Sequence, residues 1–195
     1  MVKGRILNMQ ETVQNLFNES IQIQVAAADN IGTPVLSAID KLVQALLSGN
    51  KVFTCGDETN RFVAAHFAEL LLHGCALERP PFAAIHLTGQ ARDELAQECF
   101  ARQVSALGNA GDILVVFVTQ THNERLHQAM AAAVSRDMTI ITITGDDPGD
   151  IAGLLGANDI EIRVPSNVRA RIIEQQLFLA QTFCDAIEAS IFQGV

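Results

Sequence analysis

The strongest constraint on the fold is a regular alternation of short apolar runs with longer helical patterns along residues 51–165. The runs lie at residues 52–55, 82–87, 113–119, 139–144 and 160–164. Two of them, ILVVF at 113–117 and TIITI at 139–143, are apolar or β-branched throughout. Strands of this kind are covered on both faces, as in a parallel sheet with helices on each side. The sequence therefore predicts an α/β protein with a five-stranded parallel sheet.

Helical patterns surround these runs. Between them we expect helices at 59–73, 91–107 and 123–136 and a short one near 150–155, and before them helices at 10–30 and 34–48. A last helix begins near residue 170, and its apolar residues are spaced four, three, four, three, four: Ile173, Leu177, Ala180, Cys184, Ile187 and Ile191. Because this is more apolar helix surface than one small sheet covers, we expect self-association, with this seam joining neighbouring subunits.

Composition excludes several classes of function. The chain has 195 residues, is 49% hydrophobic and carries a formal net charge of -9, which argues against direct binding to nucleic acid or to an anionic membrane. Its apolar runs are too short to span a bilayer. The cysteines show no Cys-x-x-Cys spacing, and there is no signal peptide, so we expect reduced thiols in a cytoplasmic protein. These cysteines are Cys55, Cys75, Cys99 and Cys184.

The ends of two expected strands are candidate ligand positions, because ligands of parallel α/β sheets lie at the carboxyl ends of strands. The first is the stretch CGDETNRF at 55–62, where a phosphate loop is commonly found, but here Asp57 and Glu58 follow a single glycine. The second is 119–123. The ligand-pocket candidates at these two ends are Asn60, Arg61, Thr119, Gln120 and Asn123.

Several motifs resemble the sugar isomerase (SIS) domain of the phosphoheptose isomerase type, over nearly the whole chain. They include AHFAE at 65–69, ERP at 78–80, RDMTIITITG at 136–145 and DIAGLLGANDIEIRVPS at 150–166. The resemblance implies a flavodoxin-like αβα sandwich and a homotetramer. It also implies one SIS domain over residues 1–195, with an N-terminal helical segment (1–48), an α/β core (51–165) and a C-terminal helix (170–192).

The resemblance does not carry over the family's catalytic residues. Phosphoheptose isomerases move a proton on sedoheptulose 7-phosphate with a Glu and a His, and some members hold zinc with these, a further His and a Gln. The matching positions hold Leu70 for the Glu, Gln181 for the catalytic His and Ile173 for the Gln, whereas His66 is retained. These replacements do not titrate, so we expect no catalytic residue and no cofactor. Without neighbouring ligands His66 is a structural, hydrogen-bonded histidine rather than part of a zinc site.

The phosphate loops also depart from the family pattern. Asn60 stands where the family has a serine, and of the second loop Thr119 alone keeps its residue type. We expect Asp57 and Glu58 at the N-terminal end of the helix 59–73, where their charge fills the phosphate position. The capping-box spacing at 121–124 favours Thr121 as the N-cap of the next helix.

Within the family the chain is most similar to the initiator-associating branch. This similarity implies a catalytically degenerate homo-oligomer that binds and bridges the replication initiator DnaA. The pair Ile191-Phe192 stands where that branch contacts DnaA, although Phe192 could equally lie in a subunit interface. Two alternatives stay open: a divergent phosphoheptose isomerase, and a non-catalytic sugar-phosphate sensor that uses Thr119, Asn60 and Asn123.

Overall fold

The computed structural model describes residues 2–57, 59–89 and 97–193, with side chains from residue 8 onward. The α-helices are α1 (Val2–Asn30), α2 (Gly32–Leu47), α3 (Arg61–His73), α4 (Cys99–Leu107), α5 (Glu124–Ser135) and α6 (Arg169–Glu188). The strands are β1 (Val52–Gly56), β2 (Ala84–His86), β3 (Ile113–Phe117), β4 (Thr139–Thr144) and β5 (Ile160–Arg163). A 3-10 helix η2 (Gly149–Leu154) precedes β5, and a π-helical turn η3 (Ala189–Gln193) extends α6.

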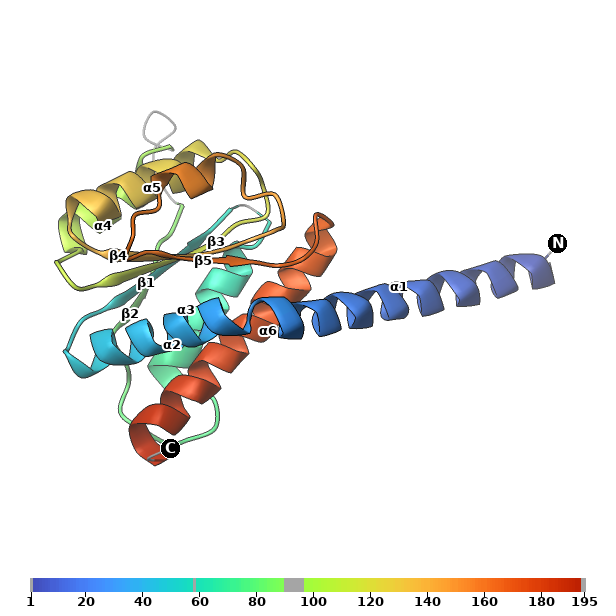
Figure 1. Ribbon diagram of the computed structural model, residues 1–195, viewed down its shortest axis with the longest axis horizontal. Coiled ribbons are helices and arrows are strands. Elements are labelled where there is room, and N and C mark those ends of the chain that lie inside the picture. The colour runs from blue at the N-terminus through green and yellow to red at the C-terminus, as the bar shows by residue number, and fades with distance from the viewer. Residues whose placement is uncertain (1, 58, 90–96, 194–195) are drawn as a thin grey trace.

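The five strands form one parallel sheet in the order β2-β1-β3-β4-β5. Residues of β3 alternate between the two faces of the sheet, as the strand period requires. Ile113, Val115 and Phe117 pack with α2, α3 and α6, and Leu114 and Val116 pack with α4 and α5. The layers of this αβα sandwich are visible in Figure 1. The predicted α/β fold with a five-stranded parallel sheet is confirmed.

The element boundaries differ from the predicted ones at a few places. The helix expected at 59–73 begins at Arg61, whose N–H donates to the Asp57 carbonyl at 2.9 Å. Of the helix expected at 91–107 the structure describes α4, and residues 90–96 lie outside the described residues, as does Glu58. In the described part of the chain, every helix is too short or too polar to cross a membrane.

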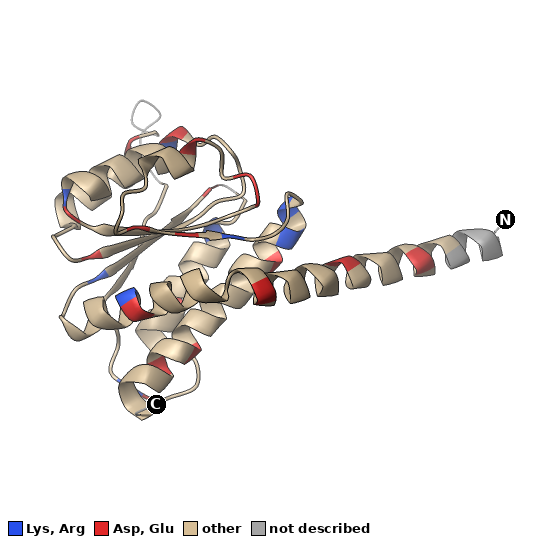
Figure 2. Ribbon diagram, viewed as in Figure 1, with Lys and Arg blue, Asp and Glu red and all other residues tan. Residues whose placement is uncertain are grey.

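Helix α1 projects away from the rest of the chain (Figure 1). It is held to α6 where the Arg171 guanidinium donates to the Leu16 carbonyl at 3.1 Å and where the Ser20 hydroxyl donates to Glu174 at 2.8 Å. From residue 8 onward its charged side chains are acidic (Figure 2). Six large apolar side chains of α1 are exposed, and we call them the α1 stripe: Met9, Val13, Leu16, Phe17, Ile21 and Val25.

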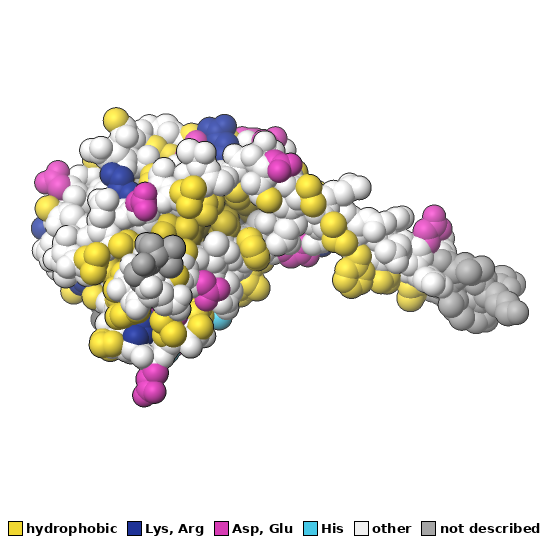
Figure 3. All heavy atoms as spheres, turned by 60° about the horizontal axis from the view of Figure 1, so that its bottom comes forward, with side chains coloured by type: hydrophobic (Ala, Val, Ile, Leu, Met, Phe, Trp, Pro, Cys, Tyr) yellow, Lys and Arg dark blue, Asp and Glu magenta, His cyan; other side chains and the backbone are white. Residues whose placement is uncertain are grey.

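The α1 stripe winds slowly along the helix, because all its members except Leu16, which adjoins Phe17, recur at steps of four residues. Apolar side chains follow the projecting rod and also gather on the body beside it (Figure 3). A contiguous exposed apolar surface of this kind marks an interaction surface.

The seam of α6, in contrast, packs mostly within the chain. Ala180, Cys184 and Ile187 are fully buried against the chain's own core, and Leu177 is 38% exposed. The expectation that this seam joins neighbouring subunits is therefore wrong for most of its length. A three-four spacing shows that a helix buries one face, but it does not distinguish a partner in the same chain from one in another.

Candidate functional site

The site lies where β1 and β3 end side by side, with Gly56 paired to Phe117 in the sheet register. The loop 57–60 leaves β1 and the loop 118–123 leaves β3, and each leads into a helix. Both predicted ligand stretches are therefore brought together at the carboxyl edge of the sheet, where parallel α/β proteins hold ligands.

The centre of this edge is the buried carboxylate of Asp57, which is 2% exposed. Its Oδ1 accepts from the Thr59 N–H at 3.0 Å and from the Thr59 hydroxyl at 2.6 Å. Its Oδ2 accepts from the N–H and the hydroxyl of Thr119, both at 2.6 Å. Backbone N–H groups and hydroxyls at strand ends are the donors that hold phosphate in such folds. The carboxylate thus occupies four donors that a phosphate would need.

Asn60 is fully buried and faces α6 instead of open space. Its amide donates to the Gln176 side chain at 2.9 Å, and Gln176 in turn donates to the carbonyls of Val118 and Ile143 at 2.9 and 2.7 Å. A Cβ on Gly56 would lie 2.6 Å from Asn60 Oδ1, so glycine is needed where the loop leaves β1. Asn60 therefore connects the two strand ends to α6.

The remaining candidates line two adjoining cavities. Arg61 lines one of about 660 Å³, and Gln120 and Asn123 line another of about 360 Å³. Asn123 also caps α5, because its Oδ1 accepts from the Leu126 N–H at 3.1 Å. The prediction of Thr121 as the N-cap is wrong. The helix starts two residues later, and the Thr121 carbonyl accepts from the Asp150 N–H at 3.0 Å.

Helices α3 and α6 bring together the positions that match the family's catalytic groups. The amide nitrogen of Gln181 lies 3.1 Å from His66 Nε2, so His66 is hydrogen-bonded as expected of a structural histidine. Leu70 is half-buried beside them, while Glu69 is exposed and pairs with His73 at 3.1 Å. Among the described residues, no group of three His, Cys, Asp or Glu side chains is arranged to hold a metal ion. At the positions that match the family's catalytic groups, Leu70 and Gln181 have no proton to exchange at ordinary pH.

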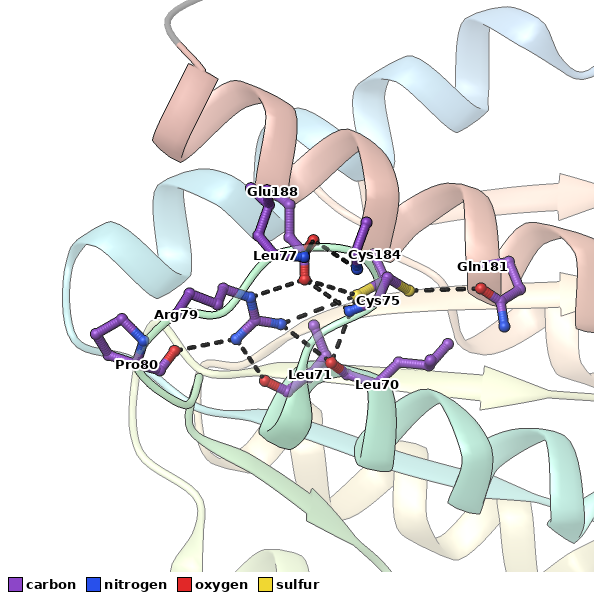
Figure 4. A network of polar contacts seen from close by, with 10 residues as sticks. Leu70, Leu71, Cys75, Leu77, Arg79, Pro80, Gln181, Cys184 and Glu188 are labelled. Carbon is purple, nitrogen blue, oxygen red and sulfur yellow. Dashed lines mark hydrogen bonds and ion pairs between the residues drawn. The ribbon is translucent and has the colours of Figure 1, made fainter.

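A buried ion pair between Arg79 and Glu188 closes the far end of these helices (Figure 4). Arg79 Nε donates to Glu188 Oε1 at 2.9 Å, and both side chains are at most 2% exposed. The carboxylate also accepts from the backbone N–H groups of Cys75, Ala76 and Leu77 at 2.8 to 3.2 Å. The guanidinium also donates to backbone carbonyls on α3 and in the loop that follows it: Leu70, Leu71 and Pro80.

The surroundings of Glu188 set its protonation. Burial by itself raises the pKa of the carboxyl, but the Cys75 N–H, the Arg79 guanidinium and the Ala76 N–H lower it more, so the pKa lies below its ordinary value. Arg79 stands in the motif ERP, and no local pattern predicts its role because its partner lies 109 residues away.

The thiol of Cys55 shows the opposite behaviour. Burial in the core, and to a smaller extent the neighbouring Cys99, raise the pKa of this thiol. Cys55 is fully buried and packs in the core.

Ile191 and Phe192 lie on the terminal turn η3. Ile191 is partly buried against the core, whereas Phe192 is 45% exposed. The Phe192 ring stacks on Phe82 with 6.0 Å between centroids, and Phe82 in turn lies under the Arg79 guanidinium at 4.0 Å. The Phe192 ring thus packs on Phe82, which in turn contacts the arginine that binds Glu188.

The match to the SIS domain covers residues 16–145, and the chain belongs to the SIS domain family. The fold is that of phosphoheptose isomerases. The enzyme from Francisella tularensis is 33% identical with a TM-score of 0.86, covering 91% of this chain and 96% of that one. GmhA from Neisseria gonorrhoeae is 32% identical with a TM-score of 0.85, covering 93% and 99% of the two chains.

Among proteins of this family, the chain is similar to the DnaA initiator-associating protein DiaA of Escherichia coli O1:K1. The two are 43% identical over 191 residues, which cover 94% of this chain and 97% of DiaA. The resemblance inferred from the sequence motifs is confirmed.

Proposed function

We propose that this chain is a non-catalytic SIS-domain homotetramer of the cytoplasm that binds and bridges copies of a DnaA-type replication initiator. The observation that carries the proposal is the 43% identity to DiaA along almost the full length of both chains. The phosphoheptose isomerases match a similar share of the chain at the lower identities of 33% and 32%.

The replacement of the family's catalytic Glu and His by Leu70 and Gln181 supports a binding role over an enzymatic one. Leu70 and Gln181 cannot exchange a proton, and the Gln181 amide is engaged with His66. The divergent-isomerase alternative predicts turnover of sedoheptulose 7-phosphate by other residues. We expect none above background from the purified protein, with or without added zinc, and turnover that disappears on mutating His66 or Glu69 would contradict this proposal.

The α1 stripe supports self-association. Six large apolar side chains facing solvent along a projecting helix are unfavourable unless another chain covers them. In an oligomer, each subunit presents one Phe192 on a rigid body, and several copies raise the apparent affinity for a partner that is itself present in several copies.

The decisive test separates the partner contact from the assembly. Phe192→Ala should leave the oligomer intact by light scattering and abolish capture of purified DnaA in a pull-down. Val134→Ala, an exposed apolar residue of α5 on the other side of the sheet, is the matched control and should capture DnaA normally. Phe17→Asp, within the α1 stripe, should dissociate the oligomer and lose capture as a consequence. If Phe192→Ala dissociates the oligomer, its ring belongs to a subunit interface and the proposed contact is wrong.

The geometry disfavours the alternative of a sugar-phosphate sensor that binds through Asn60 and Thr119. Asn60 is buried against Gln176, and the N–H and hydroxyl of Thr119 are occupied by Asp57, so these residues offer a phosphate few free donors.

A further inference from the structure

Two cysteines meet where α6 passes the loop that follows α3. Cys75 lies in this loop and Cys184 on α6, and their thiols are hydrogen-bonded to each other, side by side in Figure 4. We propose that these two thiols are a modification site, at which a small-molecule disulfide oxidises them to a disulfide bond that ties the loop to α6. This reaction does not depend on the proposed binding of an initiator protein.

The contacts around the two thiols fix them in this arrangement. The Cys75 thiol donates to the Gln181 side chain at 3.4 Å, and the Cys184 thiol donates to the Leu70 carbonyl at 3.4 Å. The backbone of the loop is held as well, because the Cys75 N–H donates to Glu188 Oε1 at 2.8 Å. Two thiols in contact are already close to the separation that a disulfide requires. The bond therefore joins groups that the fold has brought together, although 109 residues separate them along the chain.

The different exposure of the two cysteines sets the order of the steps. Cys75 is partly exposed, whereas Cys184 is fully buried, so the oxidant reaches Cys75 first. The Cys75 thiolate attacks the small disulfide, forms a mixed disulfide and releases one thiol. The Cys184 thiolate then attacks Cys75 Sγ, forms the bond within the chain and releases the second thiol. Each cysteine loses one hydrogen and one electron, and the oxidant is reduced to two thiols.

The surroundings of the two thiols make this reaction slow at neutral pH. Burial raises the pKa of the Cys75 thiol, the hydrogen bond with Cys184 lowers it in part, and the charges of Asp185 and Glu188 raise it again. Burial also raises the pKa of Cys184, with contributions from Cys75 and Glu188, and Arg79 opposes the shift. Because the thiolate is the reacting form, the rate should rise with pH. The two thiols thus stay reduced unless exposure to oxidant is sustained.

The test is incubation of the native full-length protein with glutathione disulfide, followed by alkylation and mass spectrometry. We expect the mass before alkylation to fall by about 2 Da and a peptide to link Cys75 to Cys184, both reversed by dithiothreitol. The melting temperature should rise by about 5 °C or more, because the bond restricts the unfolded chain. Cys75→Ser should abolish the reaction, and Cys184→Ala should stop it at a glutathione adduct on Cys75.

The other two cysteines provide the control. Cys55 and Cys99 are buried in the core cluster between the sheet and the helices α4 and α5, where the oxidant does not reach them. Cys99→Ala should therefore form the bond between Cys75 and Cys184 as the unchanged protein does. A linkage that includes Cys55 or Cys99, or one that joins two chains, would overturn the proposal.

A change of charge tests the reaction without removing a thiol. Asp185 is exposed on α6 and raises the pKa of Cys75, so Asp185→Asn should speed bond formation at pH 7 by about twofold or more. Asp40→Asn, at an exposed acid of α2, is the matched control and should leave the rate unchanged. The proposal fails if the unchanged protein forms no bond even at a pH of about 9, or if a glutathione adduct on Cys75 persists there.

Discussion

Asp57 and Glu188 are both buried carboxylates that accept backbone N–H groups, yet they are balanced in different ways. Glu188 meets a cation, the Arg79 guanidinium at 2.9 Å, together with three successive N–H groups of one loop. Asp57 has no cation within ion-pair distance among the described residues, and it is held by N–H and hydroxyl donors of Thr59 and Thr119. The first arrangement fastens α6 to the chain after α3. The second arrangement has the donors of an anion-binding site, and the bound anion is the Asp57 carboxylate itself.

The largest effect is expected at the Arg79–Glu188 pair. Arg79→Ala leaves the Glu188 carboxylate buried without its cation, which destabilises proteins by about 3–5 kcal/mol. Arg102→Ala removes an exposed pair with Glu98 at 4.0 Å and should cost at most about 0.5 kcal/mol. Urea unfolding followed by circular dichroism, at one protein concentration, measures both. If Arg79→Ala lowers the free energy of unfolding by less than the about 1 kcal/mol of an ordinary hydrogen bond, solvent reaches Glu188.

A smaller effect is expected at Asp57, and it should carry a functional gain. Asp57→Asn replaces one acceptor by a donor that faces the donors of Thr59 or Thr119, for a cost of about 1–3 kcal/mol. Asp57→Gly removes the carboxylate and should raise the affinity for inorganic phosphate by about tenfold, since four donors become free. Calorimetry on the two variants checks this. Unchanged phosphate affinity in Asp57→Gly would mean that the loop needs Asp57 to keep its shape.

The smallest effect is the pH dependence from Glu188. Because its pKa is lower in the folded chain than in the unfolded one, the carboxylate contributes stability that is complete above the ordinary value of 4.5 and is lost as the pH falls through the folded value. Glu188→Gln should therefore flatten the fall of unfolding free energy below pH about 5. Urea unfolding of both proteins from pH 7 to 4 measures the difference. An identical slope would assign the acid sensitivity to other groups.

The contrast between these two carboxylates also shows what sequence can predict. The five strands follow from short apolar runs, because burial on both faces leaves a local composition that is readable along the chain. The position of Asp57 in place of a phosphate could also be predicted, since its carboxylate stands in the loop after the first strand, where α/β proteins commonly bind phosphate. Its partner Thr119 was not, because the contact joins residues 62 positions apart.

Other features failed for related physical reasons. Thr121 and Asn123 are both good caps, and the choice between them depends on where the chain leaves β3. The spacing of the α6 seam shows that the helix buries one face. The spacing is the same whether that face packs within the chain or against another chain.

The form of α1 has a geometric consequence for the proposed assembly. With 29 residues the helix is about 44 Å long, so copies joined along it can keep their sheets well apart. Met9, Val13, Phe17, Ile21 and Val25 follow one another at intervals of four and form a ridge inclined to the helix axis. Ridges of this type fit into the grooves of an equivalent helix at a crossing angle of about 50°, instead of the about 20° of a coiled coil. The subunits would then splay around crossed helices, and the spacing between Phe192 rings would be set by this angle more than by the size of the sandwich.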